Sequence, residues 1–540
     1  MKKLLLLCCI LIGPASWAQD VNRYMVFFTD KEGSIYSPAE PEKFLSERAI
    51  QRRKKFNIAI TEQDLPVNEV YVEEVQAQGV AVFYRSRWMN AILVEDFPQK
   101  VEALSTLPFV SRIQYVAPGQ RLNARMHTPA YQSRREDVSD LQNQLLQVPR
   151  MHELGYTGQG IWIAVLDNGF LGVNQLAQFS HLFTQERLIR SWDFVRYSPD
   201  VFRARDHGTK ALSTIAARQE GVYSGTAPDA SFILAITEDT GDATTPNSEY
   251  IIEEYNWLLA SEWADSLGAD IISSSLGYAT FDDPSMDYTQ ADMDGQTAVA
   301  TRAASWAAQR GILVVTSSGN SRQSAWPGVG SPADADQILA VGAIDEQGVL
   351  APFSSGGPTA DGRQKPEVVA LGVNTVVIDA NGNYQTNNGT SFAAPQVAGL
   401  AAGVWQAYPE LSNLELRELL IRSGTRATSP DNEYGHGVPG FSRLQTAILG
   451  VDQSSSSSFS LYPNPVRQSH LVIDFTDAPP VGQQFSLQLV DATGRLLHSQ
   501  RLQPSPSGRY ELDVSSLQQG FYYLKVVLPQ GQRVQKFIRQ

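Results

Sequence analysis

The chain has 540 residues, of which 42% are hydrophobic and 19% are charged, and its formal net charge is -14 at pH 7. This composition excludes a largely disordered chain, and the negative charge argues against a nucleic-acid partner. The length predicts two to four domains. The acidic residues do not form one long block, so the charge predicts a solvated surface rather than a dedicated tail.

The first 18 residues have the pattern of a secretory signal peptide. Lys2 and Lys3 precede an apolar stretch, and small residues follow it before Gln19. The apolar stretch is too short to cross a bilayer, and no later segment reaches transmembrane length. Bulky leucines before Cys8 disfavour a lipid anchor. Both cysteines, Cys8 and Cys9, lie in this leader, so we expect neither a disulfide nor a cysteine nucleophile in the mature protein.

Residues 19–117 are predicted to form a small α+β domain. Strand-like and helix-like patterns alternate there in an order that suggests a β-α-β-β-α-β unit with an extra helix. The strand patterns cover 24–28, 80–84, 89–94 and 110–116, and the helix patterns cover 41–56, 67–77 and 99–107. Residues 118–145 are polar with little apolar periodicity, so we expect an exposed connector that contains a maturation site.

The block 146–450 is predicted to be an α/β domain. Continuous apolar strands, such as 161–166 and 312–315, alternate there with helical stretches, such as 249–266 and 297–309. Strands that are apolar on both faces indicate a parallel sheet with helices on both of its faces.

The last part of the chain changes character twice. Residues 451–458 contain five consecutive serines and are predicted to be a flexible linker. Residues 459–540 contain four strand-like patterns separated by turn signals, which predict a β-sandwich.

Ser391 lies in the stretch NGTSFAAPQVAGLAA, between a Gly-Thr pair and a helical run of small residues. One interpretation is structural, because a serine at such a point caps the orphan N–H groups of a helix. The other is that Ser391 is a nucleophile, because a helix start provides backbone N–H groups and a positive dipole end for a developing oxyanion. That interpretation requires a base, a carboxylate and a second oxyanion donor elsewhere.

Three residues at the ends of predicted elements supply those groups. Asp167 ends the apolar strand IWIAVLD, His207 begins a helical pattern in DHGTKALSTIA, and Asn320 follows the strand ILVVTSSGN. Each alone is a common turn or helix-start residue. Together they predict that His207 takes the proton of Ser391 and that Asp167 orients the imidazole. The Asn320 amide and the Ser391 backbone N–H would bind the tetrahedral oxyanion.

In these motifs, residues 146–450 resemble a subtilisin-type serine peptidase, a subtilase. TGQGIWIAVLDNGF carries the aspartate motif, DHGT the histidine motif and GTSFAAP the serine motif. The resemblance implies a secreted endopeptidase that acts through an acyl-enzyme without an organic cofactor, on protein or peptide substrates. It also implies that the segments ISSSLG and TSSGN bind an extended peptide. The residues concerned are Ser275, Leu276, Gly277, Ser317, Ser318 and Gly319.

The chain departs from the family pattern at three places. Asn168 follows the aspartate where the family usually has Ser or Thr, and Lys210 and Ser213 replace small or apolar residues after His207. These changes concern fine geometry and substrate preference. Residues 281–295 form an acidic insertion, for which a structural Ca²⁺ site or a solvated loop are the two interpretations. The sequence identifies no metal ligands.

The flanking segments also resemble modules found with this family. Residues 19–117 resemble the pro-segment that assists folding and occupies the cleft of subtilases, which implies a zymogen. The tail, with LYPNP, LDVSSLQQGFYYLKV and QKFIRQ, resembles the C-terminal sorting domain of the type IX secretion system. That resemblance implies contact with the secretion machinery and a location outside the outer membrane, either free or attached to the surface. A carbohydrate-binding or adhesive β-sandwich is the alternative for the tail.

Two other functions compete for the whole chain. A catalytically silent binding protein on a subtilase scaffold is disfavoured by the intact set Asp167, His207, Asn320 and Ser391. A serine esterase of the α/β-hydrolase type requires a G-x-S-x-G turn and the order Ser, Asp, His, and Ser391 has neither.

Overall fold

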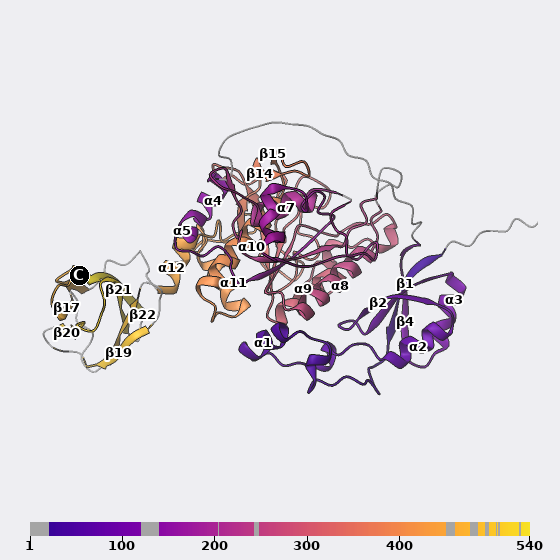
Figure 1. Cartoon of the computed structure of the whole chain (residues 1–540), viewed down its shortest axis with the longest axis horizontal. Helices are drawn as coiled ribbons and strands as arrows, with labels where there is room; N and C mark the ends of the chain where they lie inside the picture. Colours follow the sequence, from indigo (N-terminus) through magenta and orange to yellow (C-terminus); the bar gives the residue numbers. More distant parts are fainter. Residues whose placement is uncertain are drawn as a thin grey trace, which may run out of the picture. The chain divides into compact units, whose positions relative to one another are not determined.

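The computed structural model of the chain describes residues 21–119, 140–203, 205–241, 248–449, 459–475, 484–491, 496–503, 505, 508–528 and 531–539. The predicted signal peptide, most of the connector and the serine linker lie outside the described residues. The chain divides into two compact units (Figure 1). The first contains the N-terminal antiparallel sheet, and the second contains residues 45–59, the parallel sheet and the C-terminal strands.

The first unit is built on a four-stranded antiparallel sheet with the strand order β2-β3-β1-β4. Val26 of β1, Val72 of α2 and Ile92 of β3 are fully buried in its core. The order of elements agrees with the predicted β-α-β-β-α-β pattern. The strands are β1 (Asn22–Phe28), β2 (Ala81–Ser86), β3 (Ala91–Asp96) and β4 (Val110–Pro118), and the helices are α2 (Glu69–Ala77) and α3 (Pro98–Glu102).

The helix predicted over 41–56 is shorter than expected. Residues Pro41–Lys43 form a separate 3-10 turn, and α1 covers only Glu47–Lys55. Ser46 is in an extended conformation and its hydroxyl oxygen accepts a hydrogen bond from Ala49 N at 3.1 Å, which makes Ser46 the N-cap of α1. A capping serine inside an apolar-periodic stretch therefore sets a boundary that periodicity alone does not reveal.

The second unit contains a seven-stranded sheet in the order β13-β12-β11-β10-β5-β9-β6, in which every pair is parallel. Six of its seven strands are short runs that are buried on both faces, as predicted, whereas the edge strand β6 is more polar and only partly buried. They are β5 (Trp162–Asp167), β6 (Leu188–Asp193), β9 (Ser231–Ile236), β10 (Ile271–Ser274), β11 (Leu313–Ser317), β12 (Leu339–Ile344) and β13 (Val368–Leu371).

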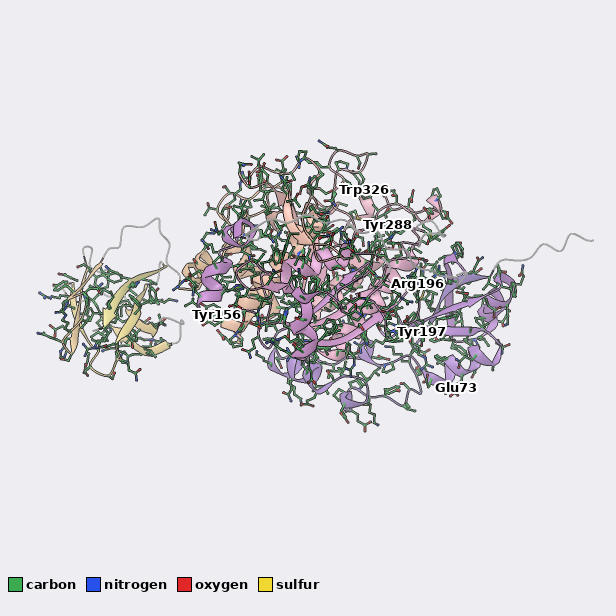
Figure 2. All side chains as sticks on the ribbon, turned by 45° about the horizontal axis from the view of Figure 1, so that its top comes forward. Glu73, Tyr156, Arg196, Tyr197, Tyr288 and Trp326 are labelled. Atoms are coloured by element: carbon green, nitrogen blue, oxygen red, sulfur yellow. The ribbon has the colours of Figure 1, made fainter. Side chains whose placement is uncertain are left out.

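Helices cover both faces of this sheet. In Figure 1, α7 (His207–Ala216) and α10 (Thr390–Ala407) lie together on one side, and α8 (Ile252–Leu267) and α9 (Val299–Gln309) lie on the other. Side chains fill the space between the layers (Figure 2). Because the strands are parallel, their carboxyl ends share one edge of the sheet, where open α/β folds place their sites.

The predicted connector ends earlier than expected. Residues Asp140–Leu145 form helix α4, and Gln142 in it is almost fully buried. The Gln142 amide bonds to both backbone groups of Val376 in β14 (Thr375–Ile378), donating to the carbonyl at 3.3 Å and accepting from the N–H at 3.0 Å. The prediction of an exposed segment is wrong here, because the polar side chains of α4 find backbone partners far away in the chain.

Helix α1 packs with the second unit, although the chain on both sides of it belongs to the first. Arg52 and Arg53 of α1 are buried, and both pair with the fully buried carboxylate of Asp265 near the end of α8. Arg53 Nη2 lies 2.9 Å from Asp265 Oδ2. Arg52 also donates to the backbone carbonyls of Ala269 and Arg310. The helix is thus bound through its basic side chains to the C-terminal ends of α8 and α9.

The C-terminal strands form two antiparallel sheets, in the orders β16-β17-β20 and β19-β18-β21-β22. Phe475 of β17 and Phe485 of β18 come from different sheets, and their ring centroids are 5.6 Å apart, which places one core between the sheets. This agrees with the predicted β-sandwich. The strands are β16 (Phe459–Tyr462), β17 (His470–Phe475), β18 (Phe485–Asp491), β19 (Leu496–Leu502), β20 (Arg509–Asp513), β21 (Gly520–Leu528) and β22 (Gly531–Arg539).

None of the helices among the described residues combines the length and the apolar character that crossing a bilayer requires.

Candidate active site

Asp167 and His207 meet where β5 ends and α7 begins. Asp167 is fully buried, and its Oδ1 lies 2.7 Å from His207 Nδ1. The N–H of Asn168 also donates to this oxygen, at 2.8 Å. The close approach depends on Gly208, because a Cβ there would lie 2.5 Å from the Gly169 carbonyl oxygen. Only glycine therefore lets the first turn of α7 bring the imidazole onto the carboxylate.

The electrostatics of this pair favour a charged imidazole. Burial lowers the pKa of His207, but the charge and hydrogen bond of Asp167 raise it, and the net shift of the pKa is upward. The second carboxylate oxygen, Asp167 Oδ2, is buried without a hydrogen-bond partner among the described residues. No hydrogen bond from the described residues to this second oxygen therefore weakens the electrostatic attraction between Asp167 and an imidazolium at His207.

Ser391 is the second residue of α10 and is 8% exposed. The N-cap of the helix is Gly389, with φ 152°, and not Ser391. The Ser391 hydroxyl makes a long hydrogen bond of 3.4 Å to the Ser275 carbonyl oxygen, while the Ser275 hydroxyl donates to the Ser391 carbonyl at 2.7 Å. The capping interpretation of Ser391 is therefore wrong, and its hydroxyl is held only weakly.

The first turn of α10 also lies against His207. Helices α7 and α10 pack on each other, and the ring of Phe392 is 5.5 Å from the His207 ring, centroid to centroid. Close packing along α10 depends on Gly399, where a Cβ would lie 1.8 Å from Thr226 Oγ1. The fold thus places the first turn of α10, which carries Ser391, beside the Asp167–His207 pair.

Asn320 reaches the same edge from the loop after β11. It is exposed, and its Oδ1 accepts hydrogen bonds from the Thr390 backbone N–H and hydroxyl, both at 2.9 Å. These two donors fix which end of the amide is oxygen, so the Nδ2 donor is left for another acceptor. The residue before it, Gly319, has φ 106°, a conformation that favours glycine and sets the direction of the loop.

Comparison with known proteins gives the family of this α/β unit. A model described as the subtilase family matches residues 158–437, which is more than half of the chain. The chain belongs to the subtilase family. Two further models match the flanks of this subtilase: a peptidase S8 propeptide domain of Bacteroidota over residues 23–134, and a secretion system C-terminal sorting domain over residues 460–540.

Curated relatives agree with the family. The subtilase is 27% identical to serine protease AprX of Bacillus subtilis over 437 residues, covering 75% of this chain and 90% of the relative. It is 30% identical to an alkaline protease of Alkalihalobacillus alcalophilus over 411 residues, covering 73% and 92%. It is 31% identical to subtilisin E of Bacillus subtilis over 285 residues, covering 52% and 64%.

The predicted class of enzyme is confirmed by these matches. The protein is a serine endopeptidase of the subtilase type, made with a propeptide. Its sorting domain marks it for export by type IX secretion, to the surface or the medium.

The two segments expected to bind substrate lie at the same edge of the sheet of the subtilase unit. Leu276 and Gly277 follow β10 and have exposed surface, whereas Ser275 is bonded to Ser391 as described. In the segment after β11, Ser318 is fully buried and its hydroxyl donates to the Ser355 carbonyl at 3.1 Å. The side chains of Ser275 and Ser318 are thus both hydrogen-bonded within the protein.

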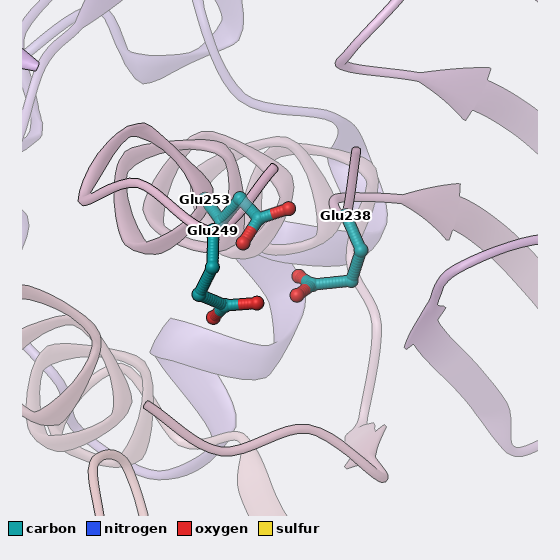
Figure 3. A group of neighbouring side chains, drawn as sticks. All are labelled: Glu238, Glu249 and Glu253. Carbon is teal, nitrogen blue, oxygen red and sulfur yellow. The ribbon is translucent and has the colours of Figure 1, made fainter. Parts of the chain in front are cut away.

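Within the acidic insertion 281–295, the carboxylates of Asp283, Asp287, Asp292 and Asp294 accept hydrogen bonds from the insertion's own backbone or its end. Asp283 accepts from the Ser285 N–H at 3.0 Å, and Asp287 from the Phe281 N–H at 2.6 Å. Among the described residues, three acidic side chains close enough to one another to share a metal ion lie elsewhere in the subtilase, at Glu238, Glu249 and Glu253 (Figure 3). The sequence alone does not reveal this group, because its members come from two separate polar stretches with no motif spacing.

Proposed function

We propose that Ser391 is the nucleophile of this subtilase, with His207 as general base and Asp167 as the group that orients and stabilises the imidazolium. The observation that supports this most is the 2.7 Å contact between Asp167 Oδ1 and His207 Nδ1, beside the first turn of α10. The oxyanion would be bound by Asn320 Nδ2 and the Ser391 backbone N–H.

In the first half of the reaction, Ser391 Oγ attacks the carbonyl carbon of the scissile bond. Its proton passes to His207 Nε2, and the imidazolium is stabilised by Asp167. The tetrahedral oxyanion forms near Asn320 and the start of α10, whose positive dipole end favours it. The C–N bond then breaks as His207 returns the proton to the leaving amine.

In the second half, the acyl-enzyme is hydrolysed. Water attacks the ester carbon, gives its proton to His207, and the Ser391 oxygen leaves with that proton. The substrate is an extended segment of a protein or peptide that adds as a strand beside residues 275–277. We also infer that the side chain before the cleaved bond is uncharged, because residues 275–277 and 317–319 contain no carboxylate for a Lys or Arg.

Replacement of Ser391 tests the mechanism. Ser391→Ala should lower kcat on the order of 10⁶-fold with the fold intact, which is the size of loss that removal of a subtilisin-type nucleophile causes. Asn320→Ala should lower kcat by about 10²–10³-fold with little change in KM, because it removes one oxyanion donor and leaves the nucleophile. Peptide hydrolysis is measured on proteins whose folding is checked by near-UV circular dichroism.

Ser412→Ala provides the matched control. Ser412 is a true N-cap, since its hydroxyl accepts from the Glu415 N–H at the start of α11 (Asn413–Arg422). Its loss should cost about 1 kcal/mol of stability and leave turnover unchanged. A folded Ser391→Ala protein that hydrolyses peptides at the wild-type rate, or that still reacts with a fluorophosphonate probe, would refute the assignment. Failure of the wild-type protein to react would favour a binding protein instead.

A further inference from the structure

Three glutamates from separate segments converge close to the catalytic edge of the sheet. Glu238 lies two residues after the end of β9, Glu249 precedes α8, and Glu253 is in the first turn of α8. A carboxylate oxygen from each lies within 4.8 Å of the others. Figure 3 shows the three side chains pointing toward one another. Glu253 is 2% exposed, whereas Glu238 and Glu249 are half-buried.

The protein supplies few partners for this charge. Glu238 accepts hydrogen bonds from the hydroxyls of Tyr278 at 2.6 Å and Thr237 at 2.8 Å, and Glu253 Oε1 accepts from the Asp239 N–H at 2.6 Å. Among the described residues, the ion pairs of this unit join other groups, such as Lys210 with Asp206 and Arg218 with Asp229, and leave the three glutamates without a Lys or Arg partner. The second oxygen of Glu253, Oε2, is buried and has no hydrogen-bond partner in the part of the chain that the structure describes.

The neighbouring Glu254 shows what a satisfied buried carboxylate looks like in this helix. Its two oxygens accept from the hydroxyls of Tyr288, labelled in Figure 2, and Ser331, and from the Ala300 N–H. Glu253, one residue earlier, leaves one of its oxygens without a donor among the described residues. A buried carboxylate oxygen without a donor or a cation is costly. The contrast indicates that a group outside the protein completes the cluster.

A cation fits that place better than any other group. The donors are all carboxylate oxygens, which are hard ligands suited to Ca²⁺ or Mg²⁺. Asp282 adds negative charge nearby, since its Oδ2 accepts from the Glu249 N–H at 3.0 Å. Ca²⁺ accepts irregular sets of six to eight oxygens, including water, and the exposed parts of Glu238 and Glu249 leave room for entry and for water ligands. Mg²⁺ demands a stricter octahedron and dehydrates reluctantly.

We propose that Glu238, Glu249 and Glu253 bind one Ca²⁺ ion. The site is joined to the catalytic edge by two contacts. The Thr237 N–H donates to the Asp167 carbonyl at 3.1 Å, and Tyr278, which donates to Glu238, directly follows Gly277. A bound ion would therefore hold both the strand that carries Asp167 and the segment expected to bind substrate.

Calcium titration of the full chain tests this proposal. The Ser391→Ala protein is used, so that it does not digest itself and so that binding is measured independently of activity. After removal of divalent ions with a chelator, calorimetric titration with CaCl₂ should show one saturable site, with a Kd on the order of 10⁻⁴–10⁻³ M or tighter. MgCl₂ should bind more weakly, and thermal unfolding should shift upward with calcium.

Two glutamate variants and one control locate the site. Glu253→Gln and the milder Glu249→Gln should each weaken calcium binding at least about tenfold, by removing one charge from the ligand set. Asp294→Asn in the acidic insertion should bind calcium as before, because Asp294 serves its own turn. The proposal is overturned by the absence of a saturable site, by unchanged binding in the folded glutamate variants, or by loss of binding in Asp294→Asn. In the first case the glutamates share protons instead.

Discussion

The two ends of helix α8 bury acidic side chains in opposite ways. Near its C-terminal end, Asp265 is fully buried and is paired with Arg52 and Arg53. In its first turn, Glu253 is almost as deeply buried, but its neighbours Glu238 and Glu249 are acidic as well. Both ends obey one rule, since a buried carboxylate needs a positive partner. At one end the chain itself provides the cation, and at the other the proposed calcium ion would provide it.

The source of the arginines gives this contrast a functional meaning. Arg52 and Arg53 lie in α1, inside the stretch 23–134 that matches the propeptide family. Removal of that stretch in maturation would take both arginines away from the Asp265 carboxylate, unless α1 stays bound after cleavage. The C-terminal end of α8 is therefore paired by arginines of the propeptide match, whereas in our proposal the N-terminal end would be paired by a calcium ion.

The largest effect on stability should come from breaking the ion pairs of Asp265 with Arg52 and Arg53, near the C-terminal end of α8. The double substitution Arg52→Ala and Arg53→Ala should lower the free energy of unfolding of the uncleaved protein by about 3–5 kcal/mol, because it removes both arginine partners of the buried Asp265 carboxylate. Urea unfolding of the Ser391→Ala protein measures it. Arg422→Ala is the control, since Arg422 forms an exposed pair with Glu418 and should cost under about 1 kcal/mol. If the double variant and Arg422→Ala lose the same free energy of unfolding, the buried ion pairs contribute no more to stability than the exposed one.

A charge-free replacement sharpens the same test. Asp265→Leu added to Arg52→Met and Arg53→Met should recover most of the lost stability, because apolar residues of similar size often replace a buried ion pair without loss. Failure to recover would mean that the bonds of Arg52 to the carbonyls of Ala269 and Arg310 matter more than its charge pair.

The contrast between the two ends also marks what could be predicted from the sequence. Asp167, His207, Asn320 and Ser391 are recognisable because each lies in a short motif at the end of a strand or helix, and parallel strands bring such ends to one edge. The parallel sheet, the N-terminal α+β domain and the C-terminal sandwich follow from periodicity in the same way. These features depend on local pattern, which the sequence displays directly.

The features that escape prediction depend on partners that are distant in the chain. Arg52 and Arg53 resemble the solvated face of a basic helix, and nothing local shows that Asp265 lies opposite them. Gln142 lies in the predicted exposed connector, because its partner Val376 is 234 residues away. Glu238 and Glu253 are brought together by the fold around the start of α8, which no spacing rule encodes. Burial of polar groups is thus the property that sequence patterns reveal least.

A smaller effect on the free energy of unfolding is expected for Glu253, in the first turn of α8, and its sign should depend on calcium. Without calcium, Glu253→Gln should raise the free energy of unfolding by about 1 kcal/mol, since it removes one of three repelling carboxylates and adds a donor. With saturating calcium the same change should lower stability, because a ligand is lost. Glu254→Gln should destabilise in both conditions, since its carboxylate already has three donors. A Glu253→Gln effect of the same sign in both conditions would contradict the proposed site.

The smallest effect concerns a third buried carboxylate, Asp167, whose cationic partner exists only when His207 is protonated. The pKa of His207 is lowered by burial and by Lys210 and raised by Asp167 and Asp206, with a net upward shift. As a base His207 must be neutral, so kcat/KM should rise with pH through this pKa. Lys210→Gln removes a cation that lowers the pKa of His207, so the acid limb of the kcat/KM profile should move to higher pH. Asp206→Asn removes an anion that raises this pKa, so the acid limb should move to lower pH.

On the acid limb each change should alter kcat/KM roughly twofold in opposite directions, because the two charges are screened by solvent. Lys210 and Asp206 also pair with each other at 3.0 Å, so loss of their ion pair alone would affect both variants alike. Shifts in the same direction would therefore attribute the effect to that pair and not to the titration of His207.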